Sequence, residues 1–101
     1  MSAEDKLGGY ASGFGGLDAN AIAANVTEDF KLLDKNGAVY EKNDLSGYIA
    51  GLRKVGDKME ITDVVVDGGK AWCKWQVGDI VGAGLISFSA DGISEEQLFY
   101  F

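Results

Sequence analysis

Histidine and proline are absent from this chain of 101 residues, and cysteine occurs once, as Cys73. Without histidine, no Ser–His or Cys–His nucleophile pair can form, and no His-containing zinc site can form either. One cysteine cannot supply a metal site or an intrachain disulfide. Any general base is therefore a carboxylate or, less readily, a lysine or tyrosine.

Basic residues and long apolar runs are also scarce. The chain has 9 Lys and Arg against 16 Asp and Glu, a net charge of −7, which opposes binding to a phosphate backbone or an anionic membrane. No apolar run is long enough to span a bilayer, and the N-terminus lacks the basic and apolar segments of a signal peptide. We expect one cytoplasmic domain, residues 1–101, that binds neither nucleic acid nor membrane.

The clearest pattern lies in the last third of the chain, residues 69–101. Three runs rich in aromatic and aliphatic residues are separated by short turn clusters at 78–79 and 90–92, which predicts an antiparallel meander. Strand residues alternate between two faces. The first run therefore places Trp72 on one face, and on the other it places Ala71, Cys73, Trp75 and Val77.

Helices are predicted upstream of the meander. An apolar stripe at helical spacing predicts a first helix over 2–14 with Ser2 as N-cap, and Asp18 caps a second that ends near 27–29. A hairpin turn at Asn36–Gly37 follows the apolar run 30–33, Asn43 caps a third helix, and 59–66 is a strand. Helices first and an antiparallel sheet afterwards predict an α+β fold with the helices on one face.

This order of elements resembles the NTF2-like superfamily, in particular its ketosteroid-isomerase and SnoaL-like branches. The resemblance covers nearly the whole chain, and its marks are the first helix, the Leu17–Asp18 start of the second, the capped third helix, and the segments 27–30, 64–68 and 84–93. It implies a cone, in which about three N-terminal helices wrap one face of a curved antiparallel sheet around a mostly apolar pocket. It also implies a homodimer through the outer sheet face, where Trp72 is the candidate contact, and it requires no cofactor.

Two positions resemble the isomerase branch when residues 10–34 are aligned without a gap. Tyr10 falls where that branch has its oxyanion-binding tyrosine, and Asp34 falls where it has its proton-shuttling aspartate, whose pKa apolar neighbours would raise. The third position, a protonated acid on a late strand, falls at about Gly84, which has no side chain to donate a hydrogen bond. Other interpretations stay open, since Asp34 also suits the start of a turn and Tyr10 suits a core stripe.

The predicted walls of the ligand pocket are Phe14, Tyr48, Trp75 and Phe88, with core packing as the alternative interpretation. Our leading hypothesis is a protein that binds a small hydrophobic carbonyl compound. It would isomerise or cyclise that compound with Asp34 as general base and Tyr10 as oxyanion donor. The alternative is a non-catalytic ligand-binding or dimerisation module on the same fold. Cys73 is expected to be buried and inert.

Overall fold

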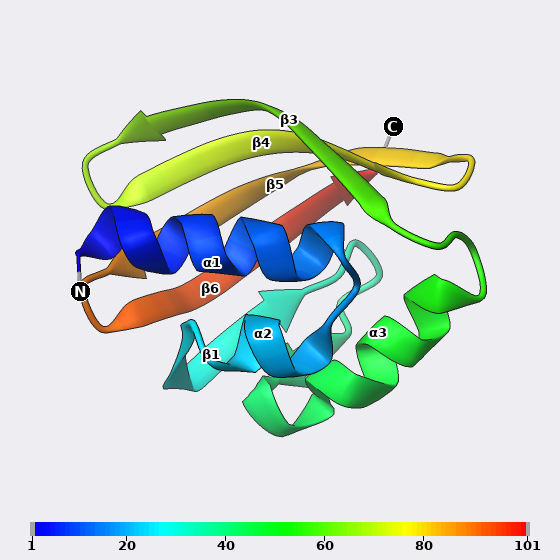
Figure 1. Ribbon diagram of the computed structural model, residues 1–101, viewed down its shortest axis with the longest axis horizontal. Helices are drawn as coiled ribbons and strands as arrows, with labels where there is room; N and C mark the ends of the chain where they lie inside the picture. Colours follow the sequence, from blue (N-terminus) through cyan, green and yellow to red (C-terminus); the bar gives the residue numbers. More distant parts are fainter. Residues whose placement is uncertain (1, 101) are drawn as a thin grey trace.

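The computed structural model describes residues 2–100, which form three α-helices, one short 3-10 helix and a single curved sheet (Figure 1). The helices are α1 (Ala3–Gly15), α2 (Ala19–Ala23), η1 (Lys42–Asp44) and α3 (Leu45–Arg53). The strands are β1 (Val26–Leu33), β2 (Val39–Glu41), β3 (Met59–Asp67), β4 (Lys70–Val77), β5 (Ile80–Ser89) and β6 (Gly92–Tyr100). Phe101, the last residue of the predicted meander, lies outside the described residues.

The strands lie in the order β2-β1-β6-β5-β4-β3. The neighbours from β3 to β6 are antiparallel, which confirms the meander. However, β1 runs parallel to β6, so the sheet is mixed, and the prediction of a purely antiparallel sheet is wrong on this pair. The long connection through α3 and the four strands β2 to β5 lets β1 and β6 run in the same direction. The α+β class, with the helices on one face of the sheet, is confirmed (Figure 1).

Capping residues fix where the first two helices begin. The Ser2 hydroxyl accepts the Asp5 amide at 3.1 Å, and the Asp5 carboxylate accepts the Ser2 amide in return, which is a capping box. The Asp18 carboxylate caps α2. The predicted end of α2 near 27–29 is wrong, because the helix ends at Ala23. The chain then enters β1 at Val26, a buried residue, and so contributes to the sheet.

Close packing places α1 against α2. A Cβ atom on Gly13 would lie 2.9 Å from Cγ1 of Ile22, closer than real Cβ atoms approach. Glycine at this position therefore lets the two helices touch, although each helical glycine costs about 1 kcal/mol relative to alanine. Packing against α2 and the sheet, rather than intrinsic propensity, holds α1 in place.

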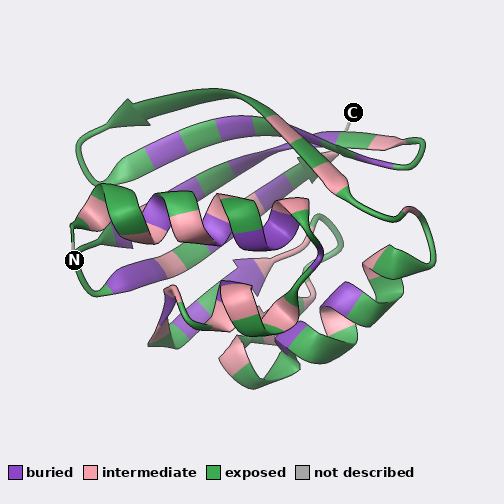
Figure 2. Ribbon diagram, in the orientation of Figure 1, coloured by how far each residue is buried: buried purple, intermediate pink, exposed green. Residues whose placement is uncertain are grey.

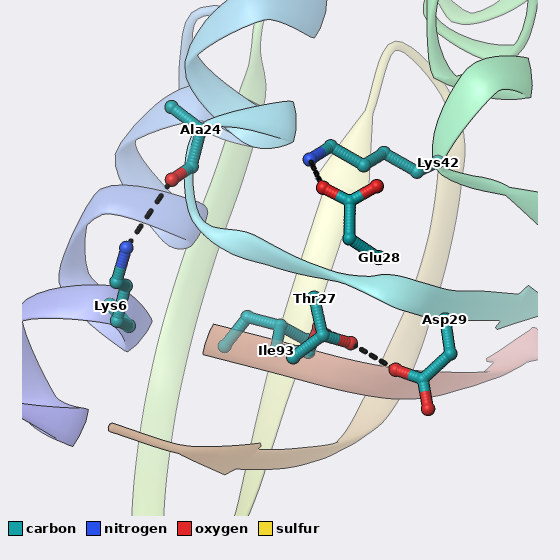
Figure 3. A network of polar contacts seen from close by, with 7 residues as sticks. All are labelled: Lys6, Ala24, Thr27, Glu28, Asp29, Lys42 and Ile93. Atoms are coloured by element: carbon teal, nitrogen blue, oxygen red, sulfur yellow. Dashed lines mark hydrogen bonds and ion pairs between the residues drawn. The ribbon is translucent and has the colours of Figure 1, made fainter. Parts of the chain in front are cut away.

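Three polar contacts lie around the start of β1 (Figure 3). The Lys6 ammonium donates to the Ala24 carbonyl at 3.5 Å, which links α1 to the end of α2. Lys42 of η1 pairs with Glu28 of β1 at 2.9 Å. The Thr27 hydroxyl donates to Asp29 at 2.6 Å. The Glu28 side chain is largely exposed, so this ion pair positions the short helix more than it stabilises the fold.

Burial alternates along β4 as the sequence predicts (Figure 2). Trp75 and its alternate neighbours are buried on the inner face, toward the helices, while Trp72 on the outer face is 38 % exposed. None of the helices in the described part of the chain is long and apolar enough to cross a bilayer. The core therefore lies between the inner face and the helical layer, and the cavity described next lies within it.

Candidate functional site

A small apolar cavity lies between α1, α3 and the inner face of β3 to β6. Its volume is about 40 Å³, which on this scale is room for roughly three water molecules. The walls are Leu7, Tyr10, Ala11, Phe14, Tyr48, Leu52, Met59, Ile61, Val64, Cys73, Trp75, Ile86, Glu96 and Leu98. Almost all of these side chains are apolar, so the few polar groups among them determine what the cavity can recognise.

A tyrosine and a glutamate meet at the wall of this cavity. Tyr10 comes from the middle of α1 and is 1 % exposed, and Glu96 comes from β6 and is 5 % exposed. The Tyr10 hydroxyl donates to Oε1 of Glu96 at 2.5 Å. The cavity therefore presents one polar pair, which we call the Tyr10–Glu96 pair, on an otherwise apolar surface.

Glu96 occupies the space that Gly84 leaves empty on the neighbouring strand. A Cβ atom on Gly84 would lie about 3.1 Å from the Glu96 Cδ and closer still to its Oε2. The absence of a side chain at Gly84 therefore makes room for the Glu96 carboxyl group. The resemblance to the isomerase branch implies an acid at about Gly84, and in the structure the Glu96 carboxyl group from β6 lies beside Gly84.

Burial dominates the protonation of this pair. Burial raises the pKa of Glu96 to about 7, and the hydrogen bond from Tyr10 opposes this rise. Burial, and then the Glu96 charge, raise the pKa of Tyr10 well above its ordinary value, so the phenol keeps its proton. Among the described residues, Tyr10 is the one hydrogen-bond donor to Glu96, and no basic side chain forms an ion pair with it. The carboxyl group is therefore poised between its neutral and charged forms at neutral pH.

Aromatic rings and a thiol complete the cavity wall. Phe14 stacks edge-on against Tyr10 at 5.0 Å between ring centroids. Trp75 and Tyr48 lie on the wall as predicted. Cys73 is buried beside them, and burial, followed by the Glu96 charge, raises its pKa to about 12. That thiol is therefore protonated at neutral pH, which agrees with the expectation of a buried, inert cysteine.

Asp34 lies in the turn after β1 and is not on the cavity wall. Its amide donates to the Ala38 carbonyl at 2.9 Å, and its carboxylate accepts the Lys35 amide at 2.7 Å. Burial, and then the neighbouring Asp34 carboxylate, raise the pKa of Tyr100 to about 12. Tyr48 of α3 is on the cavity wall, and its ring packs against Tyr40 of β2 at 4.8 Å between ring centroids.

The structure thus brings together four of the six predicted site residues, Tyr10, Phe14, Tyr48 and Trp75. Phe88 is buried in the core but is not on this wall, and Asp34 stays in its turn. Sequence reasoning missed Glu96. The available signal was alternation, because Leu98 is inward-facing, and Glu96, two residues earlier, shares its face. Residues 2–100 contain no cluster of three or more side chains suited to a metal ion.

Comparison with known proteins gives a fold but no activity. No protein-family model matches the sequence, and no curated protein matches it. An NTF-2 like protein of unknown function from Burkholderia xenovorans superposes with a TM-score of 0.79 at 10 % identity, over 96 % of this chain and 80 % of that one. A cystatin fold protein from Novosphingobium aromaticivorans superposes with a TM-score of 0.77 at 16 % identity, over 98 % of each chain.

A third similar structure has a small molecule bound. This protein from Catenulispora acidiphila has a ketosteroid isomerase-like fold and was solved in complex with trimethylamine. It superposes with a TM-score of 0.75 at 17 % identity, over 97 % of this chain and 86 % of that one. Identities this low show the fold alone. The chain therefore has the NTF2-like fold that the sequence predicted.

Proposed function

We propose that this NTF2-like chain binds a compact hydrophobic carbonyl compound in its cavity and promotes its isomerisation or cyclisation by general acid–base chemistry. The observation that carries the proposal is the Tyr10–Glu96 pair, a buried hydroxyl and a buried acid in an apolar cavity. With Glu96 protonated, its carboxyl group donates a hydrogen bond to the carbonyl oxygen, and Tyr10 supports it through Oε1. Such donors stabilise the negative charge that develops on an enolate oxygen.

The reaction needs a base that removes a proton from the carbon next to the carbonyl. The C–H electron pair then forms the enolate C=C bond, and the charge on oxygen is held by the Tyr10–Glu96 pair. We propose Asp34 as this base. Because Asp34 is not on the cavity wall, the reacting carbon has to extend out of the cavity toward the turn after β1. Asp34→Asn tests this role, since an enzyme would lose turnover while it still binds ligand.

Cavity size limits the ligand. A volume of about 40 Å³, equal to roughly three waters or about 90 Å³ of liquid, accepts only a few heavy atoms in the closed form. A larger ring system enters only if the walls move. The first probes are therefore small, and phenol, a mimic of the enolate, still requires some movement of the walls.

A second candidate function is binding of a compact organic cation. The favouring observation is that Glu96 is a buried acid with no basic partner among the described residues, on the same cavity wall as the rings of Phe14, Tyr48 and Trp75. Aromatic rings around a carboxylate are suited to alkylammonium groups. The trimethylamine complex of the Catenulispora protein is consistent with this candidate. This candidate fits the non-catalytic alternative, since binding requires no base.

One titration separates the two candidates. Burial raises the pKa of Glu96 to about 7, so the acid is mainly neutral at pH 6 and mainly charged at pH 8. When phenol binds as an enolate mimic, its oxygen accepts a hydrogen bond from the neutral acid, and its affinity is expected to fall across this range. Tetramethylammonium needs the carboxylate, and its affinity is expected to rise. Isothermal titration calorimetry with each probe at several pH values measures both.

Glu96→Gln is the matched control for this titration, because it keeps the shape and cannot ionise. Any pH dependence that comes from Glu96 disappears in this variant for both probes. Phenol affinity that is unchanged by pH and by Glu96→Gln would overturn the carbonyl proposal. Absence of saturable binding by either probe would leave the dimerisation module as the surviving alternative.

We further propose that the chain forms a homodimer through the outer face of its sheet. An exposed apolar surface, which we call the outer patch, supports this proposal. It consists of Val65, Trp72, Val81, Leu85 and Phe99. Trp72 and Phe99 pack with their ring centroids 5.6 Å apart, and Ala83 on the same face is fully buried. Contiguous apolar patches on a sheet commonly mark an interface.

Sedimentation velocity tests the dimer. Trp72→Glu places a charge in the outer patch and is expected to shift the protein to monomer. Val55→Glu is the matched control, because Val55 is 41 % exposed but follows α3 and is not one of the outer-patch residues. A wild-type protein that sediments as a monomer would contradict the proposal. So would a Trp72→Glu dimer.

A further inference from the structure

A seam between α1 and β3 runs alongside the cavity. Because β3 is the last strand of the sheet, its free edge has no strand partner and passes close to α1 (Figure 1). The two sides of the seam are the α1 residues Leu7, Ala11 and Phe14 and the β3 residues Met59, Ile61 and Val64. Among the described residues, no hydrogen bond joins α1 to β3. Only apolar packing therefore closes the cavity on this side.

Val64 is the residue of the seam that is most exposed to solvent. It is 50 % exposed, which makes it the most exposed of the described wall residues, and it still lines the cavity. The strand is irregular at this position, because pairing with β4 shifts register between Thr62 and Val65, and Asp63 has a left-handed φ of 53°. A bulge leaves its extra residue outside the ladder. Val64 can therefore move without loss of regular strand pairing.

We propose that a compact ligand reaches the Tyr10–Glu96 pair through this seam, with the bulge at 62–65 as the moving segment and Val64 as its gate. The sheet side of the cavity costs more to open. On the sheet side, ladder hydrogen bonds between β4, β5 and β6 would break. The inference rests on the proposed function only in that a ligand uses the cavity, and its test needs no ligand.

Cys73 is a built-in reporter of access. It is the one cysteine in the chain, it is buried, and it lies on the cavity wall. Methyl methanethiosulfonate is a small uncharged reagent. The Cys73 thiolate attacks its thiomethyl sulfur, forms a methyl disulfide and releases methanesulfinate. Intact-protein mass spectrometry follows the single adduct with time. All variants are compared at one alkaline pH, since burial raises the pKa of this thiol.

Val64→Trp is expected to slow Cys73 labelling on the order of tenfold, because a larger side chain blocks a local opening, and Val64→Ala is expected to accelerate it. Val66→Trp is the matched control. Val66 lies on the same strand and is 47 % exposed, but it is not on the cavity wall. Labelling in this control is expected to match wild type. Circular dichroism and thermal unfolding check that each variant is folded.

Leu52→Trp tests the competing route, because Leu52 lines the cavity from α3. Slower labelling in Leu52→Trp with no change in Val64→Trp would overturn the proposal. So would wild-type labelling that follows global unfolding as denaturant is added, since Cys73 would then be reached only in unfolded molecules. Labelling that responds to Val64 while neither phenol nor tetramethylammonium binds would remove the proposed function and leave the entrance in place.

Discussion

Two carboxyl groups, Glu96 and Asp34, lie at different places in the same molecule and differ in almost every physical respect. Glu96 is 5 % exposed, lies on an apolar wall and has one hydrogen-bond donor, Tyr10. Asp34 is half-buried in a turn, where its carboxylate accepts the Lys35 amide. The sequence predicted Asp34 as a site residue and did not predict Glu96.

The difference teaches that environment, more than position in the chain, makes a carboxyl group reactive. Removal from water disfavours charge, which brings the pKa of Glu96 to about 7. A group with a pKa near neutral can exchange protons at neutral pH in either direction. Asp34 lies in a turn off the cavity wall, where its carboxylate accepts a backbone amide. Three substitutions sharpen this contrast, from the largest expected effect to the smallest.

Glu96→Gln is expected to change the pH dependence of stability most. The folded protein holds the Glu96 proton more tightly than the unfolded chain, because burial raises the pKa from 4.5 to about 7. This contribution is fully present below pH 4.5 and is lost as the pH rises through about 7. The loss is about 3 kcal/mol. Urea unfolding of wild type and Glu96→Gln from pH 4 to pH 8 measures the difference.

From pH 4 to pH 8, the free energy of unfolding of Glu96→Gln relative to wild type is expected to rise by about 3 kcal/mol. Asp34→Asn serves as the control, because it keeps Glu96 and therefore keeps the decline. Parallel curves for wild type and Glu96→Gln would show that Glu96 ionises in the same way in the folded and unfolded chains, which would contradict a burial-raised pKa.

Gly84→Ala is expected to destabilise the protein by about 2 kcal/mol, because its methyl group would overlap the Glu96 carboxyl group. The cost is expected to shrink in a Glu96→Ala background, where the space is free. A double-mutant cycle by urea unfolding measures the coupling between the two positions. Additive effects would mean that the two residues do not share this space.

Asp34→Ala is expected to cost about 1 kcal/mol or less, because it removes the acceptor for the Lys35 amide in a partly exposed turn. The pH dependence that comes from Glu96 remains. Thermal unfolding of Asp34→Ala beside Asp34→Asn measures this cost. A loss as large as that of Gly84→Ala would show that Asp34 has a structural role deeper than the turn.

Much of the fold could be predicted because local rules govern it. Ser2 and Asp18 are the caps that the sequence indicates, and the alternation along β4 separates Trp72 from Trp75 as expected. The end of α2 could not be placed from spacing alone. Val26 fits a helical stripe as well as a strand, and its burial in the sheet determines which one forms.

The candidate site was only half predictable for a related reason. Tyr10 lies on a regular helical stripe, so its inward direction followed from spacing. The pairing of β6 with β5 is irregular between Ser87 and Phe88. Counting alternate residues forward from the turn therefore does not predict which face of the sheet Glu96 occupies. The space beside Gly84 depends on how β5 pairs with β6, so a local sequence pattern cannot predict it.

The pKa of Glu96, followed through its side-chain carboxyl carbon by NMR in wild type and in Tyr10→Phe, tests most directly whether a buried, proton-exchanging acid lies in the cavity. We predict titration near pH 7 in wild type. We predict a still higher pKa in Tyr10→Phe, because the hydrogen bond from Tyr10 stabilises the carboxylate. Titration of wild type near the model-peptide value of about 4.3, unchanged by Tyr10→Phe, would contradict this and remove the buried acid from the proposed chemistry.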